Sequence, residues 1–326
     1  MKTKITIALA ILFLTIGCTN HTKNATDSKL TTTLKLNWIF TGSFAPEAFS
    51  AKNYAAKNNL TLKLEPGGQG KDPLKLVKDN EFGAAAADEI LHANDKGADF
   101  VIVGLINYDS PACFISQEKD NIKTPKDFEG KTVGILPFGS TGLIYKILLK
   151  KARVDESKIK EVSVYPDLKI FLTGHTHQVQ PAFIYDETVS LDLLNVKYNI
   201  IEPAKYGVVF KGPCYFTTAK TVAENPALVK AFIATMAQGM NAAIARPVDA
   251  VKALKAVAPE INESRELKVW VKGAPYYRGH SNKPLTWDID SWTNMVSELM
   301  AFKELKQTPN LNKTLNATFI DDYYKK

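Results

Sequence analysis

The chain has 326 residues, of which 45% are hydrophobic and 23% are charged, with a formal net charge of +7. This balance excludes an intrinsically disordered or collagenous chain, and the length predicts about two domains. Lys and Arg are dispersed without a run of five, so we expect no nucleic-acid partner.

Residues 1–17 have the pattern of an export signal. Two lysines precede an apolar run from Ile5 to Ile16, which is shorter than the about 20 residues that a membrane span requires. The segment ends in Gly17-Cys18 and resembles the lipobox of bacterial lipoproteins, in which the cysteine becomes the lipid-bearing N-terminus, with acyl chains such as palmitate. An ordinary secretory signal with a chance cysteine is the alternative. We expect a membrane-anchored protein that faces the periplasm or the outside of a bacterium.

The polar residues 18–33 predict a tether between the anchor and the folded body. After it, strand-like and helix-like segments alternate, which is typical of parallel βαβ units. The expected strands cover 34–38, 60–64, 82–87, 100–106, 132–136, 161–165, 179–185 and 200–201, and one or two longer strands return over 207–219. The expected helices cover 46–57, 72–79, 89–96, 142–152, 167–173 and 187–194, and the rest of the chain is mostly helical. We expect no segment after the export signal that is long and apolar enough to be transmembrane.

This order of elements predicts two α/β lobes, with late elements rejoining the first lobe and a cleft between them. We expect lobe 1 to contain residues 34–108 and 206–326, and lobe 2 residues 109–205. Crossovers near 108–112 and 203–209 would join them. In parallel sheets ligands bind beyond the carboxyl ends of the strands, so the loops that follow strands are the candidate site.

Neither catalytic nor metal-binding motifs are evident. Residues 139–142 (Gly-Ser-Thr-Gly) lack the spacing of a nucleophile elbow. His175 and His177 have no ligand partners at zinc-like spacing, which favours a solvated turn. Cys113 and Cys214 lie in apolar strand-like runs and predict buried free thiols. We therefore expect no enzyme activity, cofactor or metal.

Two loops carry polar groups suited to a ligand. Ser140 and Thr141 precede the predicted helix 142–152, where backbone N–H groups could hold an anion or a carbonyl, although an ordinary helix N-cap fits equally. Asp88 and Glu89 follow the run 84–87 of four alanines and could accept hydrogen bonds from a ligand. An Asp N-cap with a first-turn Glu is the alternative.

Aromatic residues stand at three further strand ends. Trp38 ends the first strand beside the turn that contains Phe44, Tyr108 follows the strand 100–106, and Tyr185 precedes Asp186. Core packing is the ordinary role of a single aromatic side chain, but Trp38 also adjoins a Gly- and Ser-containing turn.

The stretch LNWIFTGSFAPEAFSAKNYAAKNNLTLKLEPGG resembles the opening of NMT1/THI5-like solute-binding proteins of ABC transporters. The resemblance continues through FGAAAADEIL, GADFVIVGLIN, IKTPKDFEGKTVGI, QPAFIYDE and ENPALVKAFIAT and covers roughly residues 34–257. It implies an α/β, two-lobed periplasmic-binding-protein fold of type II, with parallel-rich sheets flanked by helices and a cleft that closes on a small molecule. It also implies a monomer that delivers its ligand to an ABC permease in the membrane.

The resemblance places ligand contacts at the strand ends already described. The implied positions are Trp38, Phe44, Asp88, Asn107, Ser140, Thr141, Tyr185 and Asp186. We expect an aromatic heterocycle, a thiamine-precursor pyrimidine or a riboflavin-like molecule. The segment EPGGQGKDPLKLV is similar to a stretch of the riboflavin-type members. Trp38 would stack on the ring, Asp88 would accept its N–H groups, and the start of the helix at Ser140 would hold a carbonyl.

Two alternatives remain open. An alkanesulfonate or nitrate-type anion would require a cation near the helix start. Arginine is scarce, and we expect all of the arginines that could serve to lie outside the cleft loops: Arg153, Arg246, Arg265 and Arg278. An enzyme that processes a pyrimidine on the same fold is the other alternative, although the Cys-rich segment of the fungal enzymes has no counterpart here.

Overall fold

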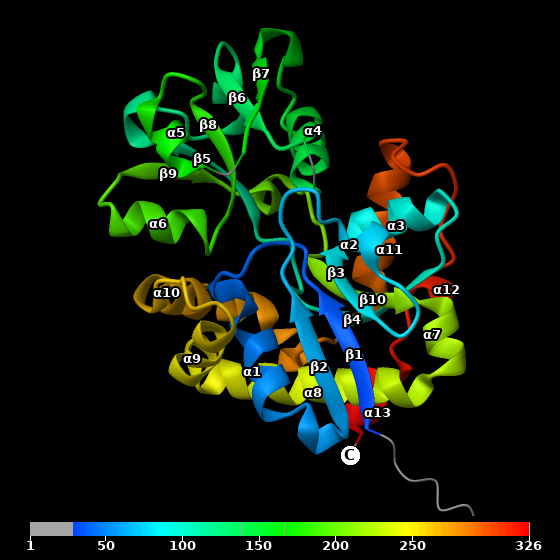
Figure 1. Ribbon diagram of the computed structural model, residues 1–326. Helices are drawn as coiled ribbons and strands as arrows, with labels where there is room; N and C mark the ends of the chain where they lie inside the picture. The colour runs from blue at the N-terminus through cyan, green and yellow to red at the C-terminus, as the bar shows by residue number, and fades with distance from the viewer. Residues whose placement is uncertain (1–28, 138, 166, 326) are drawn as a thin grey trace, which may run out of the picture.

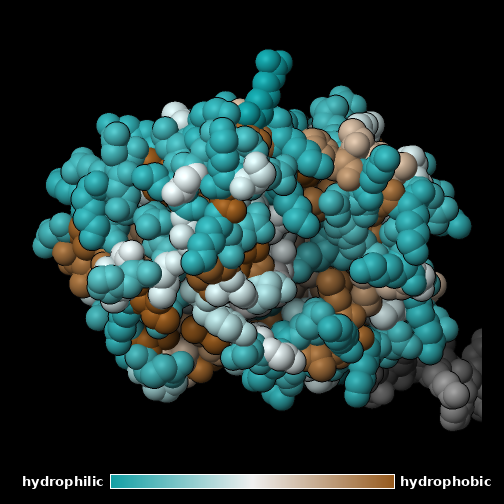
Figure 2. All heavy atoms as spheres, turned by 90° about the horizontal axis from the view of Figure 1, so that it is seen from above, coloured by the Kyte–Doolittle hydropathy of each residue, from teal (hydrophilic) through white to brown (hydrophobic). Residues whose placement is uncertain are grey.

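A computed structural model describes residues 29–137, 139–165 and 167–325. The expected export signal and Cys18 lie outside the described residues. Figure 1 shows two lobes, each built on one five-stranded sheet, with lobe 2 above lobe 1. The view from above, onto lobe 2, shows a mainly hydrophilic surface in which apolar side chains form separate patches (Figure 2). Such a surface suits contact with water.

The sheet of lobe 1 has the strand order β2-β1-β3-β10-β4. Its strands are β1 (Leu30–Lys35), β2 (Leu60–Glu65), β3 (Phe82–Ala86), β4 (Phe100–Leu105) and β10 (Pro213–Thr218). β1 runs parallel to β2 and β3, whereas β10 is antiparallel to both of its neighbours. The late strand β10 therefore completes a sheet that begins at the N-terminal end of the described chain.

The sheet of lobe 2 has the order β7-β6-β8-β5-β9. Its strands are β5 (Ala112–Gln117), β6 (Thr132–Ile135), β7 (Lys160–Ser163), β8 (Val179–Phe183) and β9 (Tyr198–Ile201). β6 pairs in parallel with β7 and β8, and β5 is antiparallel to β8 and β9. Each lobe thus has a parallel core with one antiparallel strand inserted, in agreement with the parallel-rich sheets expected.

Helices cover both faces of each sheet (Figure 1). Those of lobe 2 are α4 (Thr141–Lys151), α5 (Leu168–Thr173) and α6 (Glu187–Leu193). Those of lobe 1 are α1 (Ala45–Asn53), α2 (Pro73–Leu76), α3 (Ala87–Asp95), α7 (Ala219–Glu224), α8 (Pro226–Ala245), α9 (Pro247–Val257), α10 (Glu263–Gly273), α11 (Ile289–Ala301), α12 (Leu311–Thr314) and α13 (Thr318–Tyr324). Proline opens α2, α8 and α9 at the first helical position, where its missing N–H costs nothing.

Helix α8 has the composition of a membrane span but is mostly buried within lobe 1. Within the described part of the chain, α8 alone is long and apolar enough to cross a membrane, with a mean hydropathy of 1.2 over its most apolar window. This finding corrects our expectation that no segment after the export signal has that length and composition. Its burial explains the composition: 61% of that window is buried, and Phe232 and Met236 lie in the core of lobe 1. A helix covered on most sides by protein is apolar all round.

Alternate residues of the lobe 1 strands point into two different cores. Ala84 and Tyr215 contribute to the core beneath α1, whereas Ala85 and Cys214 contribute to the core beneath α3. We call these sides the α1 face and the α3 face. The helices that follow β1 and β3 therefore leave the sheet in opposite directions, which makes the boundary between these strands a topological switch point.

The same arrangement recurs in lobe 2. Helix α4, which follows β6, packs with Val133 in the core that continues from the α3 face. Helix α6, which follows β8, buries Leu191 in a separate small core with Ala182 and Phe171. β6 and β8 therefore form a second switch point.

Two segments cross between the sheets, residues 106–111 and 202–212. They lie side by side, because Ser110 N–H donates to Phe210 O at 2.8 Å and Gly212 N–H donates to Asn107 O at 3.1 Å. The buried ammonium of Lys211 pairs with Asp109 at 2.8 Å and lies 3.9 Å from the centre of the Tyr108 ring. The crossovers thus form one paired connection.

Several local predictions require correction. β1 begins at Leu30, inside the expected tether, because Thr32 is buried and the strand pairs with β2 from its first residue. The helix expected over 72–79 ends at Leu76, since Val77 is extended. The return over 207–219 is a single strand, and residues 207–212 belong to the crossover.

Two predictions about unusual side chains have different outcomes. His177 is 1% exposed and its ring lies 2.5 Å from Gln180 Oε1, so the expected solvated turn is wrong at this position. Cys113 and Cys214 are free and buried, as predicted, and burial raises the pKa of both thiols.

Candidate functional site

The carboxyl ends of the two sheets face one another across the junction between the lobes. Tyr185, after β8, donates from its hydroxyl to Asn107 Oδ1, after β4, at 3.1 Å. Gln69, after β2, donates to the hydroxyl of Tyr165, after β7, at 2.9 Å. These contacts bring the carboxyl ends of the two sheets together, and this is the edge at which an open α/β sheet binds its ligands.

The loop after β1 is held by close backbone contacts. Trp38 is half-buried against the core of the α1 face, and its carbonyl accepts from Gly67 N–H at 2.9 Å. A Cβ at Gly67 would lie 2.3 Å from Leu36 O, so only glycine fits where the Pro-Gly-Gly segment passes this loop. Phe44 is 8% exposed and packs into the lobe 1 core. In this arrangement the Trp38 ring is therefore the more accessible of the two.

Asp88 lies at the start of α3, on the other side of the first switch point. It is 2% exposed, and Oδ1 has no hydrogen-bond partner among the described residues. Burial, with the neighbouring Glu89 as a second cause, raises the pKa of Asp88 to about 8. The N-cap of α3 is Ala86, so the alternative in which Asp88 caps the helix is wrong.

Ser140 and Thr141 stand at the start of α4, at the second switch point. Ser140 occupies the N-cap position, but its side chain makes no capping hydrogen bond, because its backbone is already helical at φ −78° and ψ −13°. Thr141 is 5% exposed, and Oγ1 is without a partner in the described part of the chain. Neither hydroxyl therefore makes the hydrogen bond of an ordinary helix N-cap.

Tyr185, from lobe 2, packs into the core of lobe 1. Its ring is 2% exposed and packs beside Gly273, where an added Cβ would lie 3.2 Å from the ring. The centres of the Tyr276 and Tyr277 rings lie 5.6 Å and 6.3 Å away. Its partner Asn107 is 1% exposed, and Asn107 Nδ2 finds no acceptor among the residues described. Tyr185 therefore joins the lobes in this arrangement.

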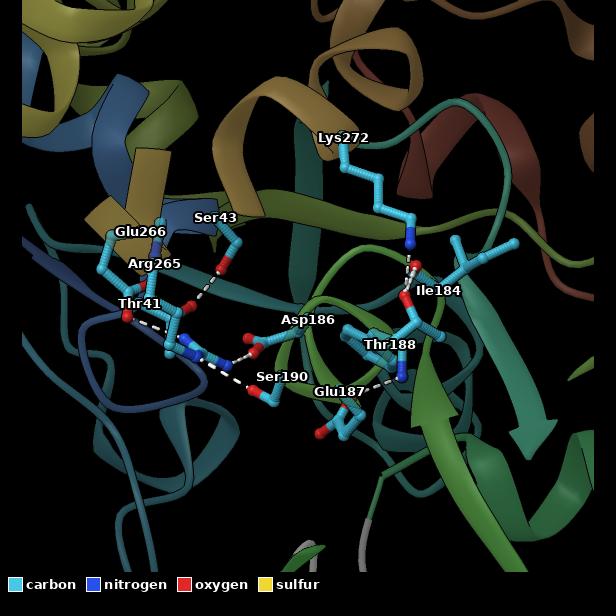
Figure 3. A network of polar contacts seen from close by, with 12 residues as sticks. Thr41, Ser43, Ile184, Asp186, Glu187, Thr188, Ser190, Arg265, Glu266 and Lys272 are labelled. Atoms are coloured by element: carbon cyan, nitrogen blue, oxygen red, sulfur yellow. Dashed lines mark hydrogen bonds and ion pairs between the residues drawn. The ribbon is translucent and has the colours of Figure 1, made fainter. Parts of the chain in front are cut away.

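Asp186 forms part of a polar network between α10 and α6, which Figure 3 shows from close by. Arg265 on α10 is ion-paired with Asp186 and donates to Ser190 Oγ at 3.0 Å. Lys272 donates to Thr188 Oγ1 at 2.8 Å and pairs with Asp192 at 3.2 Å. We call these six residues the α10–α6 latch.

The latch overturns one expectation from the sequence. Arg265 was expected to lie outside the cleft loops, yet it contacts the loop after β8. The second carboxylate that it pairs with is Glu266, at 2.7 Å. Arg265 is therefore shared between two acids, which leaves little of its charge for an anionic ligand.

A buried carboxylate that sequence reasoning missed lies behind the Trp38 loop. Glu47, in the first turn of α1, is 1% exposed, and its Oε1 accepts from the Tyr215 hydroxyl at 2.6 Å. Oε2 has no partner in the described residues, and burial raises the pKa of Glu47 to about 7. The one feature of the sequence that could have indicated this burial is an acid between apolar residues in the helix APEAFSAKN.

The electrostatic character of the junction follows from these groups. Burial raises the pKa of Glu47, Asp88 and Glu187, so each favours its neutral form more than usual. A site of this kind offers carboxyl groups that accept hydrogen bonds and, when protonated, also donate one, and it offers little uncompensated positive charge.

Comparison with known proteins places the chain in a family. A family model described as NMT1/THI5 like matches residues 48–250, more than half of the chain. The chain belongs to the NMT1/THI5-like family. It is also 22% identical, over 78% of its length and 83% of the other protein, to a 4-amino-5-hydroxymethyl-2-methylpyrimidine phosphate synthase of Legionella pneumophila.

Solved structures share the fold of this NMT1/THI5-like chain. A putative periplasmic sulfonate-binding protein of Methylobacillus flagellatus superposes with a TM-score of 0.67 at 13% identity, over 91% of this chain and 95% of the other. The periplasmic aliphatic sulphonate-binding protein of Escherichia coli gives 0.66 at 14% identity, over 88% and 91%. The α/β periplasmic-binding-protein fold is thereby shown.

Proposed function

We propose that this protein is the solute-binding component of an ABC importer and that it captures a small aromatic heterocycle between its lobes. Membership of the NMT1/THI5-like family and the two-lobed fold support a binding role. In the described part of the chain two crossovers join the lobes, a connection suited to hinge closure around a ligand.

One observation carries the proposal. Three buried polar atoms that follow β3, β4 and β6 have no partner among the described residues: Asp88 Oδ1, Asn107 Nδ2 and Thr141 Oγ1. A buried polar group left without a hydrogen bond costs about 1–3 kcal/mol. A ligand that supplied matching donors and acceptors would recover that cost, and this is the ordinary origin of affinity in a polar site.

The surrounding groups favour a heterocycle that carries N–H donors. Asp88 would accept such a donor, and Trp38 would stack on the ring, which adds about 0.5–1.5 kcal/mol to the area buried. Aminopyrimidines and flavin-like rings both present N–H groups beside ring acceptors, and the Legionella pneumophila relative is named for an aminopyrimidine.

A sulfonate or nitrate is the second candidate ligand, favoured by the names of the structural relatives. The local charge is less favourable to it. An anion near Asp88 would meet an acid rather than a cation, and Arg265 is already paired with Asp186 and Glu266.

An enzyme is the second candidate class, favoured by the synthase relative. Incubation with candidate pyrimidine precursors, followed by mass spectrometry, separates the classes: a binder returns its ligand unchanged. Formation of a pyrimidine phosphate at a rate that depends on protein concentration would replace the importer proposal.

The importer role requires a location outside the cytoplasm, and we propose a lipid anchor at Cys18. Metabolic labelling with a fatty acid should mark the wild type but not Cys18→Ser. Equal labelling of both proteins would exclude this anchor.

Calorimetry tests the ligand class. Trp38→Ala should weaken binding of an aminopyrimidine at least about tenfold, because the ring loses its stacking surface. Asp88→Asn should weaken it about tenfold by replacing an acceptor with an amide. Asp290→Asn, an exposed acid on α11, serves as the control and should bind normally. Tighter sulfonate binding by Asp88→Asn, with normal binding by Trp38→Ala, would establish the anion instead.

A further inference from the structure

A buried polar cluster links Glu47 to the candidate site. Glu47 contacts Tyr215 on β10, and the hydroxyl of Tyr277, on the short helix η7 (Ala274–Arg278), donates to Ser43 O at 2.8 Å. The centre of the Tyr277 ring lies 6.3 Å from that of the Tyr185 ring. Glu47, Asn107, Tyr185, Tyr215 and Tyr277 are each at most 2% exposed, and we call them the tyrosine cluster.

Two buried atoms of the cluster lack a hydrogen-bond partner among the described residues, and one is an acceptor and the other a donor; we call them the two unfilled positions. Glu47 Oε2 is an acceptor without a donor, and Asn107 Nδ2 is a donor without an acceptor, among the described residues. None of the cluster's hydroxyl protons reaches Glu47 Oε2: Tyr215 donates to Glu47 Oε1, Tyr185 to Asn107 Oδ1 and Tyr277 to Ser43 O. Native proteins satisfy nearly all buried polar groups, so two exceptions in one cluster call for a partner.

The cluster extends from the sheet of lobe 1 to the loop after β1. Tyr215 pairs with Ala84, the middle residue of β3, and with Gly104, next to the carboxyl end of β4. Glu47 stands in the first turn of the helix that follows the Trp38 loop, and Ser43 belongs to that loop. The two unfilled positions therefore lie beside the first switch point.

We propose that Glu47 is a specificity-determining residue of the ligand site, whose Oε2 accepts an N–H from the edge of the ligand ring while Asn107 Nδ2 donates to a neighbouring ring acceptor. This inference rests on the proposed binding function, and it specifies that the ligand carries an N–H donor beside a ring acceptor. A 4-aminopyrimidine presents that pair of groups, because its exocyclic N–H lies beside a ring nitrogen that accepts.

Isosteric variants test each half of the pair. Glu47→Gln keeps the acceptor for Tyr215 and replaces Oε2 by a donor. Asn107→Asp keeps the acceptor for Tyr185 and replaces Nδ2 by an acceptor. Tyr215→Phe removes the partner of Oε1 but leaves Oε2, so it isolates the positioning of Glu47 from its contact with ligand. Glu224→Gln, an exposed acid at the end of α7, is the control.

The probes are 4-amino-2-methylpyrimidine and its 4-methoxy analogue, which lacks the N–H, with thermal unfolding used to check that each variant folds. Binding is measured at about pH 8.5, because the pKa of Glu47 is raised to about 7 and Oε2 is free of a proton only when the carboxyl is ionised. We expect Glu47→Gln to bind the amino compound at least tenfold more weakly than the wild type and the methoxy compound nearly as the wild type does. Asn107→Asp should weaken both at least tenfold, because both ring nitrogens accept. Tyr215→Phe should retain the wild-type preference for the amino compound.

Three outcomes would overturn the inference. Equal weakening of both compounds by Glu47→Gln would reduce Glu47 to a structural residue. Unchanged binding by Glu47→Gln would remove Glu47 from the site and leave the proposed function standing. Binding of ethanesulfonate but of neither pyrimidine by the wild type would contradict both the proposed ligand class and the proposed role of Glu47.

Discussion

The two sides of the junction between the lobes are built from different interactions. On one side the α10–α6 latch joins the lobes through ion pairs and hydroxyl groups (Figure 3). On the other side the core of the α3 face continues from α11 through the crossover residues Val208 and Phe210 to α4. One ion pair, Lys151 with Glu298 at 2.5 Å, accompanies that apolar contact.

This difference indicates which side opens. Polar groups of the latch can exchange their partners for water at small cost, whereas separating an apolar core exposes surface at about 25 cal/mol per Å². We therefore expect the crossover side to act as the hinge and the latch side to separate when ligand enters.

The largest effect is expected from Trp292→Ala on the apolar side. Trp292 is fully buried in the core of the α3 face, and removal of a buried aromatic side chain costs about 3–5 kcal/mol. Urea denaturation should show a loss of this size, with Val257→Ala, at a half-exposed position, as the control. A loss below about 1 kcal/mol would mean that the hinge side is not a tightly packed core.

Arg265→Gln should break the latch with an intermediate effect. It leaves Asp186 and Glu266 without their cation, and because all three side chains are partly or largely buried we expect a loss of about 1–2 kcal/mol. Small-angle scattering of the ligand-free protein should give a larger radius of gyration than the wild type. A radius equal to that of the wild type would mean that other contacts hold this side closed.

Stability should fall as pH rises through the range in which the buried carboxyls ionise. The pKa values of Glu47 and Asp88 are raised to about 7 and about 8, so the folded state keeps protons that the unfolded state releases. Their contribution is complete below about pH 4 and is lost as pH rises through 7 to 8. Burial lowers the pKa of His177, which opposes this trend below about pH 6.5.

Urea midpoints at about pH 5.5 and 8.5 test this dependence, and Glu47→Gln should show a smaller difference between the two than the wild type. An unchanged difference would indicate that Glu47 is ionised in the folded protein at both pH values.

The smallest effect is expected from Lys272→Ala, at the exposed end of the latch. Lys272 and Asp192 have side chains that are 36% and 54% exposed, and pairs of this kind contribute about 0–1 kcal/mol. The same urea titration should place Lys272→Ala within about 1 kcal/mol of the wild type. A loss as large as that of Arg265→Gln would show that the two ends of the latch act as one unit.

Much of the candidate site could be predicted because it follows from strand ends. Alternating and continuous apolar runs marked the strands, and each strand end marked a loop, which is how Asp88 and Thr141 were selected, whereas the resemblance to the family added Asn107. The resemblance to the family selected the same positions. Their unpartnered atoms could not be predicted, because a sequence pattern contains no information about which distant groups reach a buried oxygen.

Errors arose where long-range packing overrode local pattern. His177 looked like part of an exposed turn because Gly174 precedes it, but the ring is buried against Phe171 at a centre distance of 5.7 Å. Thr32 belonged to a polar segment and is nevertheless covered, because β1 pairs with β2 and β3.

The sequence by itself determined the period of each element and the order in which elements follow one another, and hence the two α/β lobes and the loops at their strand ends. Local periodicity suffices there because side-chain direction repeats every two residues in a strand and about every 3.6 in a helix. Only the tertiary structure decided that Arg265 pairs with Asp186, that Tyr185 packs into the opposite lobe and that Glu47 is buried against Tyr215. These contacts depend on which helix faces close over which strand ends, and that is fixed by the packing of the whole chain.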